Sequence, residues 1–237
     1  MPADAGVGAE PGRPMENGSP ASPPVSRGAE ATLRVVEWMG LPALLKEREV
    51  KGYRAKALDD RLRRERTRTE ARLLVDARRL GVRTPIVYDI DLAKHRLVLE
   101  QLAGPTLKEL LEDPAVAPEL LTGAVRRFGE AVGRLHAGGI SHGDLTSSNV
   151  LFPTGPEGPP ALLDLSMGSR SPGIEELGID LHLVEEDLKA LHPKPEPLVR
   201  AFSEGYAAGN PSGAKDVRAR AKAIRGRVRY ALSLIHI

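Results

Sequence analysis

One polar loop between two apolar runs constrains the fold of this chain more than any other segment does. The stretch ISHGDLTSSNVLF, residues 140–152, places Asp144 and Asn149 five positions apart, and Asp164 follows the apolar run ALL. A single loop aspartate is usually a turn or cap residue. The ordered set is far more specific. It predicts short strands near 150–152 and 161–164, with Asn149 and Asp164 each at the end of one.

Upstream segments have mostly the pattern of strands, and downstream segments mostly that of helices. β-rich runs predict strands near 32–38 and 43–47 and a hairpin over 85–102. Apolar residues three or four positions apart predict a long helix over 58–80, ended by Gly81, and another over 120–139. The predicted fold class is therefore α+β, with a small β-rich N-lobe that carries one long helix and a mainly helical C-lobe.

Composition suggests where these lobes begin and end. Residues 1–26 are rich in Gly, Pro, Ala and Ser, so they cannot bury enough apolar surface to offset the entropy lost on ordering. We expect a disordered tail there, the N-lobe at 27–104, the C-lobe at 105–214 and a basic helix or tail at 215–237. We assign no function to the final stretch, ALSLIHI.

The overall composition excludes several classes of protein. Hydrophobic residues make up 41% and charged residues 28%, which is typical of a globular protein with a core. Aromatic residues make up only 3%, which argues against nucleic-acid recognition by base stacking. The chain has no cysteine, which excludes disulfides and thiolate metal sites. No run of 18 apolar residues occurs, so we expect a cytoplasmic protein that does not associate with membranes.

Lysine and arginine are concentrated in two blocks. Residues 46–83 hold 14 Lys or Arg against 7 Asp or Glu, and residues 215–229 hold 7 against 1. The span 84–214 between them holds 10 against 19. The blocks are either solvated helix faces or a surface for a polyanion such as RNA, or for an acidic protein partner.

The polar set fits the needs of phosphoryl transfer. This chemistry requires metal ions on the phosphates, a cation on their oxygens and a base near the attacking hydroxyl. Asp164 and Asn149 offer the hard oxygen ligands that Mg²⁺ prefers, and Asp144 could accept the hydroxyl proton. The same order occurs in protein kinases and their relatives as H-x-D-x-x-x-x-N followed by D-F-G, here HGDLTSSN and DLS. His142 would have a supporting, structural role.

An upstream cation and its orienting carboxylate would complete such a site. Lys46 lies in the predicted strand ALLKERE, and Glu70 follows 24 residues later on the long helix. Taken alone, Lys46 would be a surface residue and Glu70 a partner for a neighbouring arginine of its helix. The stretch GAEA, which contains Gly28 and Glu30, gives a weak indication of a reduced phosphate-covering loop.

Three stretches of the sequence resemble a known family. KGYRAKALDDRLRRERTRTEARLL, HGDLTSSN and GIDLHLVEEDLKALHP are similar to the small atypical kinase/ATPase of the KEOPS (EKC) tRNA-modification complex, in its archaeal form. The resemblance covers about residues 28–229 and implies a minimal bilobal protein-kinase-like fold without a long activation segment or A-P-E motif. It also implies ATP and Mg²⁺ as cofactors, and ATP hydrolysis or Ser/Thr phosphorylation that supports the threonylcarbamoyl transferase acting on tRNA adenosine.

The resemblance further implies a role for each matching position. The transferase and other KEOPS subunits would be partners, and tRNA would meet segments 46–83 and 215–229. Glu100 would be the hinge whose backbone meets adenine. The expected catalytic residues are Asp144, Lys46 and Glu70, the nucleotide-binding residues Lys46, Gly28, Glu30, Glu100, Asn149 and Asp164, and the metal ligands Asn149 and Asp164.

One departure and two alternatives accompany this interpretation. Leu165-Ser166 stands where the family usually has Phe-Gly; leucine can serve as a packed anchor, whereas serine lacks the backbone freedom of glycine. A small-molecule kinase of the aminoglycoside or choline phosphotransferase type shares the core motif but usually has a larger C-lobe. A non-catalytic scaffold would keep the fold but would be expected to lack Lys46, Asp144 or Asn149, and all three are present.

Overall fold

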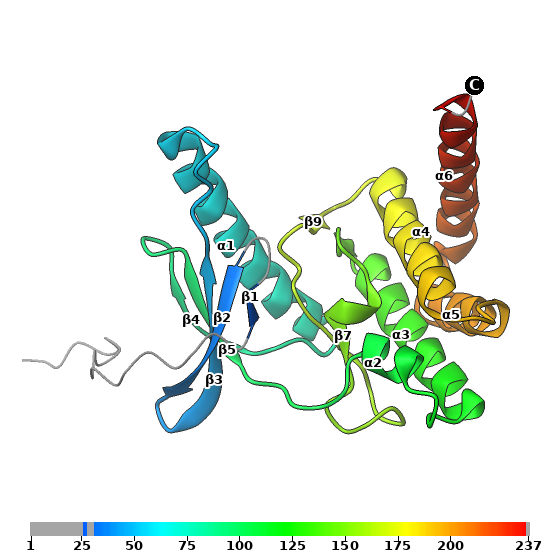
Figure 1. The fold of residues 1–237 in the computed structure, drawn as a ribbon, viewed down its shortest axis with the longest axis horizontal. Helices are drawn as coiled ribbons and strands as arrows, with labels where there is room; N and C mark the ends of the chain where they lie inside the picture. Colours follow the sequence, from blue (N-terminus) through cyan, green and yellow to red (C-terminus); the bar gives the residue numbers. More distant parts are fainter. Residues whose placement is uncertain (1–25, 28–30, 236–237) are drawn as a thin grey trace, which may run out of the picture.

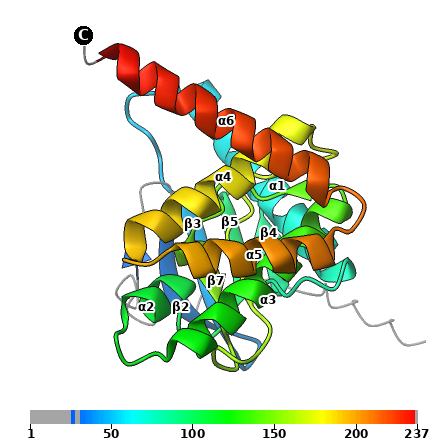
Figure 2. The ribbon, with the colours of Figure 1, turned by 90° about the vertical axis from the view of Figure 1, so that its right-hand side faces the viewer.

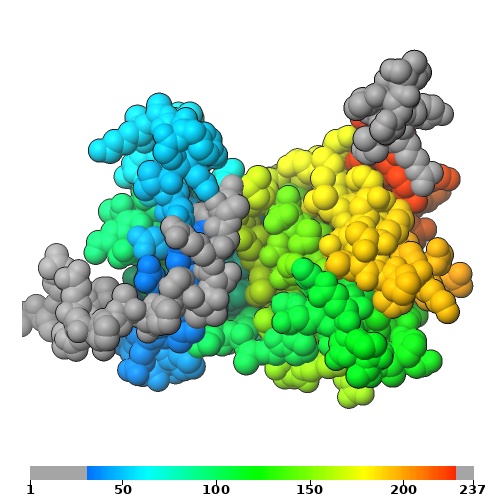
Figure 3. All heavy atoms as spheres, in the orientation of Figure 1, coloured from blue at the N-terminus to red at the C-terminus, as the bar shows by residue number. Residues whose placement is uncertain are grey.

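A computed structural model describes residues 26–27 and 31–235, which form two lobes (Figure 1). Within the described residues, the first lobe contains a five-stranded antiparallel sheet of order β1-β2-β3-β5-β4 and one long helix. The space-filling view shows the two lobes side by side, the first in blue to sea-green and the second in green to red (Figure 3). The elements of the first lobe are β1 Ser26–Arg27, β2 Ala31–Trp38, β3 Leu41–Arg48, α1 Lys56–Arg79, β4 Val87–Asp91 and β5 Arg96–Glu100.

The hairpin of β2 and β3 places Lys46 in the centre of this sheet. Met39 and Gly40 connect the strands with φ values of 50° and 78°, which is the two-residue turn whose twist matches that of the strands. β3 pairs with β2 on one side and with β5 on the other, so Lys46 lies opposite both Leu33 and Leu97. Both hydrogen-bonded edges of β3 are therefore occupied around the predicted catalytic lysine.

Helix α1 confirms the long helix expected over 58–80. The helix ends at Arg79 with Leu80 as its C-cap, and Gly81 follows with φ 75°, a left-handed conformation that suits glycine after a helix. Its buried face includes Leu73, Leu74 and Ala77 but also carries polar side chains, among them Glu70 at 1% exposure. One face of α1 thus brings a carboxylate into the interior of the lobe.

The second lobe is built mainly from helices. Every residue of the predicted apolar stripe in the helix over 120–139 is buried: Leu121, Ala124, Val125, Phe128, Val132 and Leu135. The helices are α2 Leu107–Glu112, α3 Pro118–Ala137, α4 Ile174–Leu191, α5 Glu196–Gly209 and α6 Ala214–Ile235. Two short strand pairs, β6 Ile140–Ser141 with β9 Ser169–Arg170 and β7 Val150–Leu151 with β8 Ala161–Leu162, frame the polar loop, which contains the short helix η1 Ser147–Asn149.

The strands around the polar loop are shorter than predicted. β8 ends at Leu162, and Asp164 lies beyond it with φ 52°, so the prediction of a strand that reaches Asp164 is wrong. The backbone N–H of Leu163 still donates to the carbonyl of Asn149 at 2.8 Å, after which the chain turns into the left-handed region. The turn, rather than a strand end, directs the Asp164 carboxylate.

Helices α3 and α5 pack closely because glycines line their contact. A Cβ on Gly205 would lie 1.9 Å from the carbonyl oxygen of Arg126, and one on Gly133 would lie 2.5 Å from that of Tyr206. Figure 2 shows α6 lying across α4 on the other side of this lobe. No helix in the part of the chain that the structure describes is both long and apolar enough to cross a membrane.

We expect Gly205→Ala to destabilise the protein by about 2 kcal/mol or more, because the added methyl group would meet backbone that cannot move independently. The matched control is Gly226→Ala in α6, where a Cβ would meet nothing within 4 Å. This control should be neutral or stabilising by about 0.5–1 kcal/mol, since alanine favours a helix interior. Urea unfolding of both variants would measure the difference, and equal stabilities would contradict the close packing of α3 and α5.

Candidate active site

Four charged side chains meet between the two lobes. The Lys46 Nζ atom lies 2.7 Å from Glu70 Oε1 and 2.9 Å from Asp164 Oδ1. The Arg48 guanidinium contacts the other oxygen of Glu70 at 2.5 Å. The structure therefore brings together Lys46, Glu70 and Asp164, which the sequence predicts to share a site, and adds Arg48.

Burial makes this network strong. The side chains of Lys46, Arg48 and Glu70 are 8%, 4% and 1% exposed, whereas that of Asp164 is 37% exposed and lies on the solvent side. Burial raises the pKa of Glu70, and the charges of Lys46 and Arg48 counter that shift. Burial, the largest single effect, would raise the pKa of Asp164, but Lys46, the hydrogen bond from Ser166 and the charge of Arg48 together outweigh it and lower this pKa to about 2. The Asp164 carboxylate is therefore ionised at neutral pH.

Asp180 of α4 fixes the polar loop through hydrogen bonds to its backbone. The sequence patterns did not single out this residue. The Asp180 carboxylate is fully buried and accepts the backbone N–H groups of His142 and Gly143 at 2.7 and 2.8 Å. It also lies 3.2 Å from Nε2 of the buried His136. The sequence carries no local signal for this burial, because a charged residue of an amphipathic helix can face either water or a buried partner.

His142 has the structural role that the sequence predicts. Its Nε2 lies 2.9 Å from the carbonyl oxygen of Leu163, and its Nδ1 accepts the backbone N–H of Asp144 at 3.3 Å. Burial lowers the pKa of His142, although the charges of Asp180, Asp164 and Asp144 oppose that shift. A neutral imidazole with its proton on Nε2 satisfies both contacts and ties the polar loop to the segment before Asp164.

Asp144 and Asn149 lie together at the exposed end of the loop. The Asn149 amide nitrogen donates to the Asp144 backbone carbonyl at 2.8 Å and to its carboxylate at 3.1 Å. Because the nitrogen is engaged in this way, the amide oxygen of Asn149 is the atom that can ligate a metal. Asp144 keeps an exposed carboxylate, as a base facing a substrate requires.

The donor set fits magnesium carried by a nucleotide. A carboxylate and an amide oxygen are hard ligands, and Mg²⁺ usually takes few of these from the protein and the rest from phosphates and water. Among the described residues, no group of three or more His, Cys, Asp or Glu side chains could hold a metal ion by itself. A metal held by Asn149 and Asp164 would accordingly depend on ligands from outside the protein.

The Leu165-Ser166 departure is accommodated by the backbone. Leu165 is fully buried, as expected of a packed anchor. Ser166 does not adopt a positive φ, and its N–H donates to the Asp164 carboxylate at 3.3 Å. The polar loop over 140–152 does require a glycine, at position 143. Gly143 has φ 81° and lies so close to Met167 that a Cβ would be 2.1 Å from the Met167 carbonyl oxygen.

The remaining predicted residues lie at the edges of the site. Glu100 is the last residue of β5, and its side chain accepts from Arg83 at 2.6 Å and from the N–H of Ile86 at 3.0 Å. Its carboxylate thus fixes the segment after α1, while its backbone begins the connection to the C-lobe. Gly28 and Glu30 lie outside the described residues, between β1 and β2.

Many cations of the two basic blocks have carboxylate partners within the chain. In the first block, Arg63 pairs with Asp59 at 2.8 Å. In α6, Arg220 and Arg227 both contact Glu175 of α4, and Arg225 contacts Glu185. These blocks therefore contribute to the internal structure of the protein.

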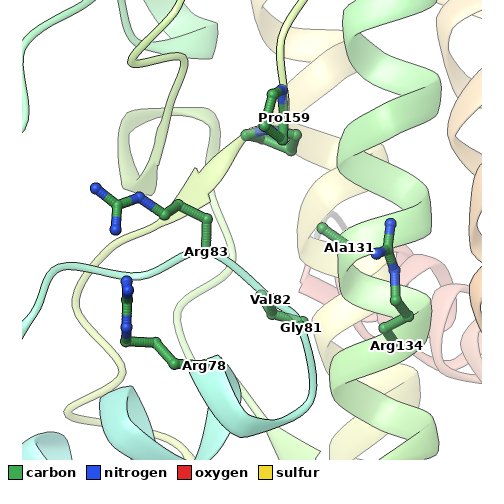
Figure 4. A pocket seen from close by; sticks show the side chains of 8 residues that line it. Arg78, Gly81, Val82, Arg83, Ala131, Arg134 and Pro159 are labelled. Atoms are coloured by element: carbon green, nitrogen blue, oxygen red, sulfur yellow. The ribbon is translucent and has the colours of Figure 1, made fainter.

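A cavity of about 320 Å³ lies apart from this site (Figure 4). It contains none of the predicted catalytic, nucleotide-binding or metal-binding residues. Its lining comes from the end of α1, from α3 and from the segment before β8, namely Arg78, Gly81, Val82, Arg83, Ala131, Arg134, Pro159 and Pro160.

The fold of the chain is similar to that of a solved kinase structure. The solved structure of the Rio2 kinase from Chaetomium thermophilum matches 86% of this chain and 71% of its own with a TM-score of 0.51, at 15% sequence identity. The chain therefore has a two-lobed kinase fold, which confirms the predicted α+β class. No protein-family model matches the chain.

Several relatives in sequence are each named a probable bifunctional tRNA threonylcarbamoyladenosine biosynthesis protein. That of Methanosarcina acetivorans is 39% identical over 96% of this chain and 37% of its own length. Those of Methanoculleus marisnigri and Halobacterium salinarum are 42% and 37% identical over 93% and 89% of this chain and 38% and 36% of their own. The chain is thus a homologue of these proteins, which confirms the predicted resemblance. It spans little more than a third of their length.

We expect Asp180→Asn to lower the free energy of unfolding by about 3 kcal/mol, because the buried carboxylate accepts two backbone N–H groups that an amide cannot accept equally well. Asp216→Asn at the exposed start of α6 is the control and should change stability by less than about 0.5 kcal/mol. Urea unfolding would measure both. A loss no larger than the control's would show that Asp180 does not hold the loop.

Proposed function

We propose that this chain binds ATP with Mg²⁺ between its lobes and transfers the γ-phosphate to a protein hydroxyl or to water. The observation that supports it best is the position of Lys46, which contacts Glu70 at 2.7 Å and Asp164 at 2.9 Å. A buried lysine held by two carboxylates can exchange one of them for phosphate oxygens. The kinase fold and the geometry of the polar loop agree with this proposal.

Each residue would then have one task. Lys46 would contact the phosphates while Glu70 keeps its ammonium in place, and Asn149 and Asp164 would hold the metal. Magnesium, when bound, would neutralise charge that develops on the phosphates. Asp144 would orient the attacking hydroxyl and accept its proton at the carboxylate that Asn149 steadies. Gly28, Glu30 and the backbone of Glu100 would contact the nucleotide.

The names of the relatives suggest the setting for this activity. We propose that the chain acts in the cytoplasm in threonylcarbamoyladenosine modification of tRNA, as the kinase/ATPase of a KEOPS-type complex. Its partners would be the threonylcarbamoyl transferase and the other subunits of that complex. Because the chain matches about a third of each bifunctional relative, a transferase could be the partner activity in the remaining part.

Exposed cations in the two basic blocks would meet tRNA. Lys215, Arg218 and Lys222 of α6 are exposed, and no salt bridge involves them among the described residues. Arg218 and Lys222 are four positions apart, so they lie on the same face of the helix. This face is the part of the second block that supports the proposal best.

We expect Asp144→Asn to lower ATP turnover by about 10²-fold or more, because the substitution removes the proton acceptor. Asp164→Asn should abolish turnover, so that no dependence of turnover on Mg²⁺ remains. Release and transfer of labelled γ-phosphate would be measured for the chain alone, with the transferase, and with transferase and tRNA.

Asp113→Asn, at an exposed position after α2, is the matched control and should retain full activity. Free phosphate would indicate an ATPase, and labelled protein a kinase. Fast phosphorylation of aminoglycosides, choline or sugars would favour the small-molecule kinase instead. Nucleotide binding without turnover in any mixture would leave a scaffold and overturn the catalytic proposal.

We expect tRNA affinity to fall about tenfold or more between about 50 and about 200 mM salt, as counterion release from several phosphate contacts requires. Arg218→Ala with Lys222→Ala should weaken binding and flatten this dependence. A double variant from the acidic span, Lys108→Ala with Arg200→Ala, should do neither. A salt titration with a slope near zero would reject RNA binding by the basic blocks.

A further inference from the structure

Arg48 is a buried member of the Lys46 network to which neither the predicted roles nor the proposed chemistry gives a task. Its side chain is 4% exposed, and its guanidinium lies 2.5 Å from Glu70 Oε2. A buried arginine is rare unless its charge is compensated. The buried position of Arg48 therefore requires a group of opposite charge close to its guanidinium. One compensating group is Glu70, the same carboxylate that orients Lys46.

The backbone fixes where Arg48 can reach. Residues two positions apart on a strand point to the same face, so Arg48 projects beside Lys46 towards α1. It lies opposite Ala31 in the ladder of β2 and β3, and its backbone N–H donates to the carbonyl of His95 at 3.2 Å. The guanidinium therefore approaches Glu70 from a position that the sheet determines on both sides.

Arg48 supplies one of the two positive charges among these four side chains. Lys46 and Arg48 supply two positive charges, and Glu70 and Asp164 supply two negative charges. Without Arg48, Lys46 alone would have to neutralise two carboxylates and would be held more tightly between them. The second oxygen of Glu70, at a site with 1% exposure, would lose its charged partner.

We propose that Arg48 is a positioning residue that holds Glu70 and shares its charge, so that Lys46 is available to leave Asp164 for the phosphates of a nucleotide. This inference rests on the proposed nucleotide function and adds a residue to it. Arg48 does not touch the reacting atoms; it acts through Glu70. The guanidinium suits this task because its charge is permanent and its planar donors hold a carboxylate in a fixed orientation.

Two consequences follow for a variant without the guanidinium. Lys46 would bind phosphates less effectively, so turnover should fall more than nucleotide affinity does. The charge of Arg48 also opposes the raised pKa of Glu70, so its removal raises that pKa further. A carboxylate with a higher pKa is protonated earlier as the pH falls, and activity should therefore be lost at a higher pH than in the unaltered protein.

The experiment compares Arg48→Met, Arg48→Lys and Glu70→Gln, each alone, with the double variant Arg48→Met and Glu70→Gln. ATP turnover and the binding of a fluorescent ATP analogue with Mg²⁺ are measured across the acidic limb of the pH profile, and thermal unfolding is measured in parallel. Arg48→Met should lower kcat about tenfold or more, with a smaller change in KM, and should move the acidic limb to higher pH. Arg48→Lys should restore part of both, and the double variant should be no worse than Glu70→Gln.

The control is Arg126→Met on α3, outside the site and both basic blocks, where the side chain is 53% exposed and pairs with the exposed Glu204. It should change neither kcat nor the pH profile. If Arg48→Met lowers thermal stability but leaves the acidic limb in place, or if its effect multiplies with that of Glu70→Gln, Arg48 is structural only and the inference is overturned.

The proposed function can fail separately. If the unaltered chain binds the analogue without turnover, catalysis is rejected, and the affinity of the same variants across pH decides the role of Arg48. If the unaltered chain neither binds nor turns over nucleotide, the proposed function is rejected and the inference falls with it.

Discussion

The site depends on the burial of Lys46 between two carboxylates. A charged group in a protein interior costs several kcal/mol unless a partner lies close to it, and removing one partner of a buried pair costs about 3–5 kcal/mol. Glu70 reaches Lys46 from α1 of the first lobe, and Asp164 reaches it from the second. The same ammonium therefore stabilises the position of the long helix and joins the lobes where a nucleotide would bind.

The second lobe supplies its part of the site through backbone hydrogen bonds. Asp180 accepts the N–H groups of His142 and Gly143, and His142 in turn contacts the carbonyl of Leu163, one residue before Asp164. Asp180 and His142 are fully buried, so displacement of either would leave polar groups unsatisfied in the interior. The loop and the segment that carries Asp164 consequently hold each other in place.

Sequence patterns located most elements but only part of this network. Apolar periodicity revealed α1 and α3, and the spacing of Asp144, Asn149 and Asp164 revealed the loop, because these signals are local. Arg48 and Asp180 are charged residues within amphipathic segments, where a sequence gives no sign of whether a charge faces water or a buried partner. The backbone turn at Asp164 was not predicted for a related reason. The length of a two-residue strand such as β8 is determined by its hydrogen bonds to distant residues, and local propensity does not contain these.

The pairing of α6 with α4 bears on whether the second basic block can also bind a polyanion. Exposed ion pairs contribute about 0–1 kcal/mol each, so the contacts of Arg220 and Arg227 with Glu175 cannot by themselves hold the helix. The buried apolar face of α6, which includes Val217, Ala221 and Ile224, is what docks it. Phosphates could replace these carboxylates at small cost while the helix stays in place, so internal pairing and binding of an anionic partner are compatible roles for the same arginines.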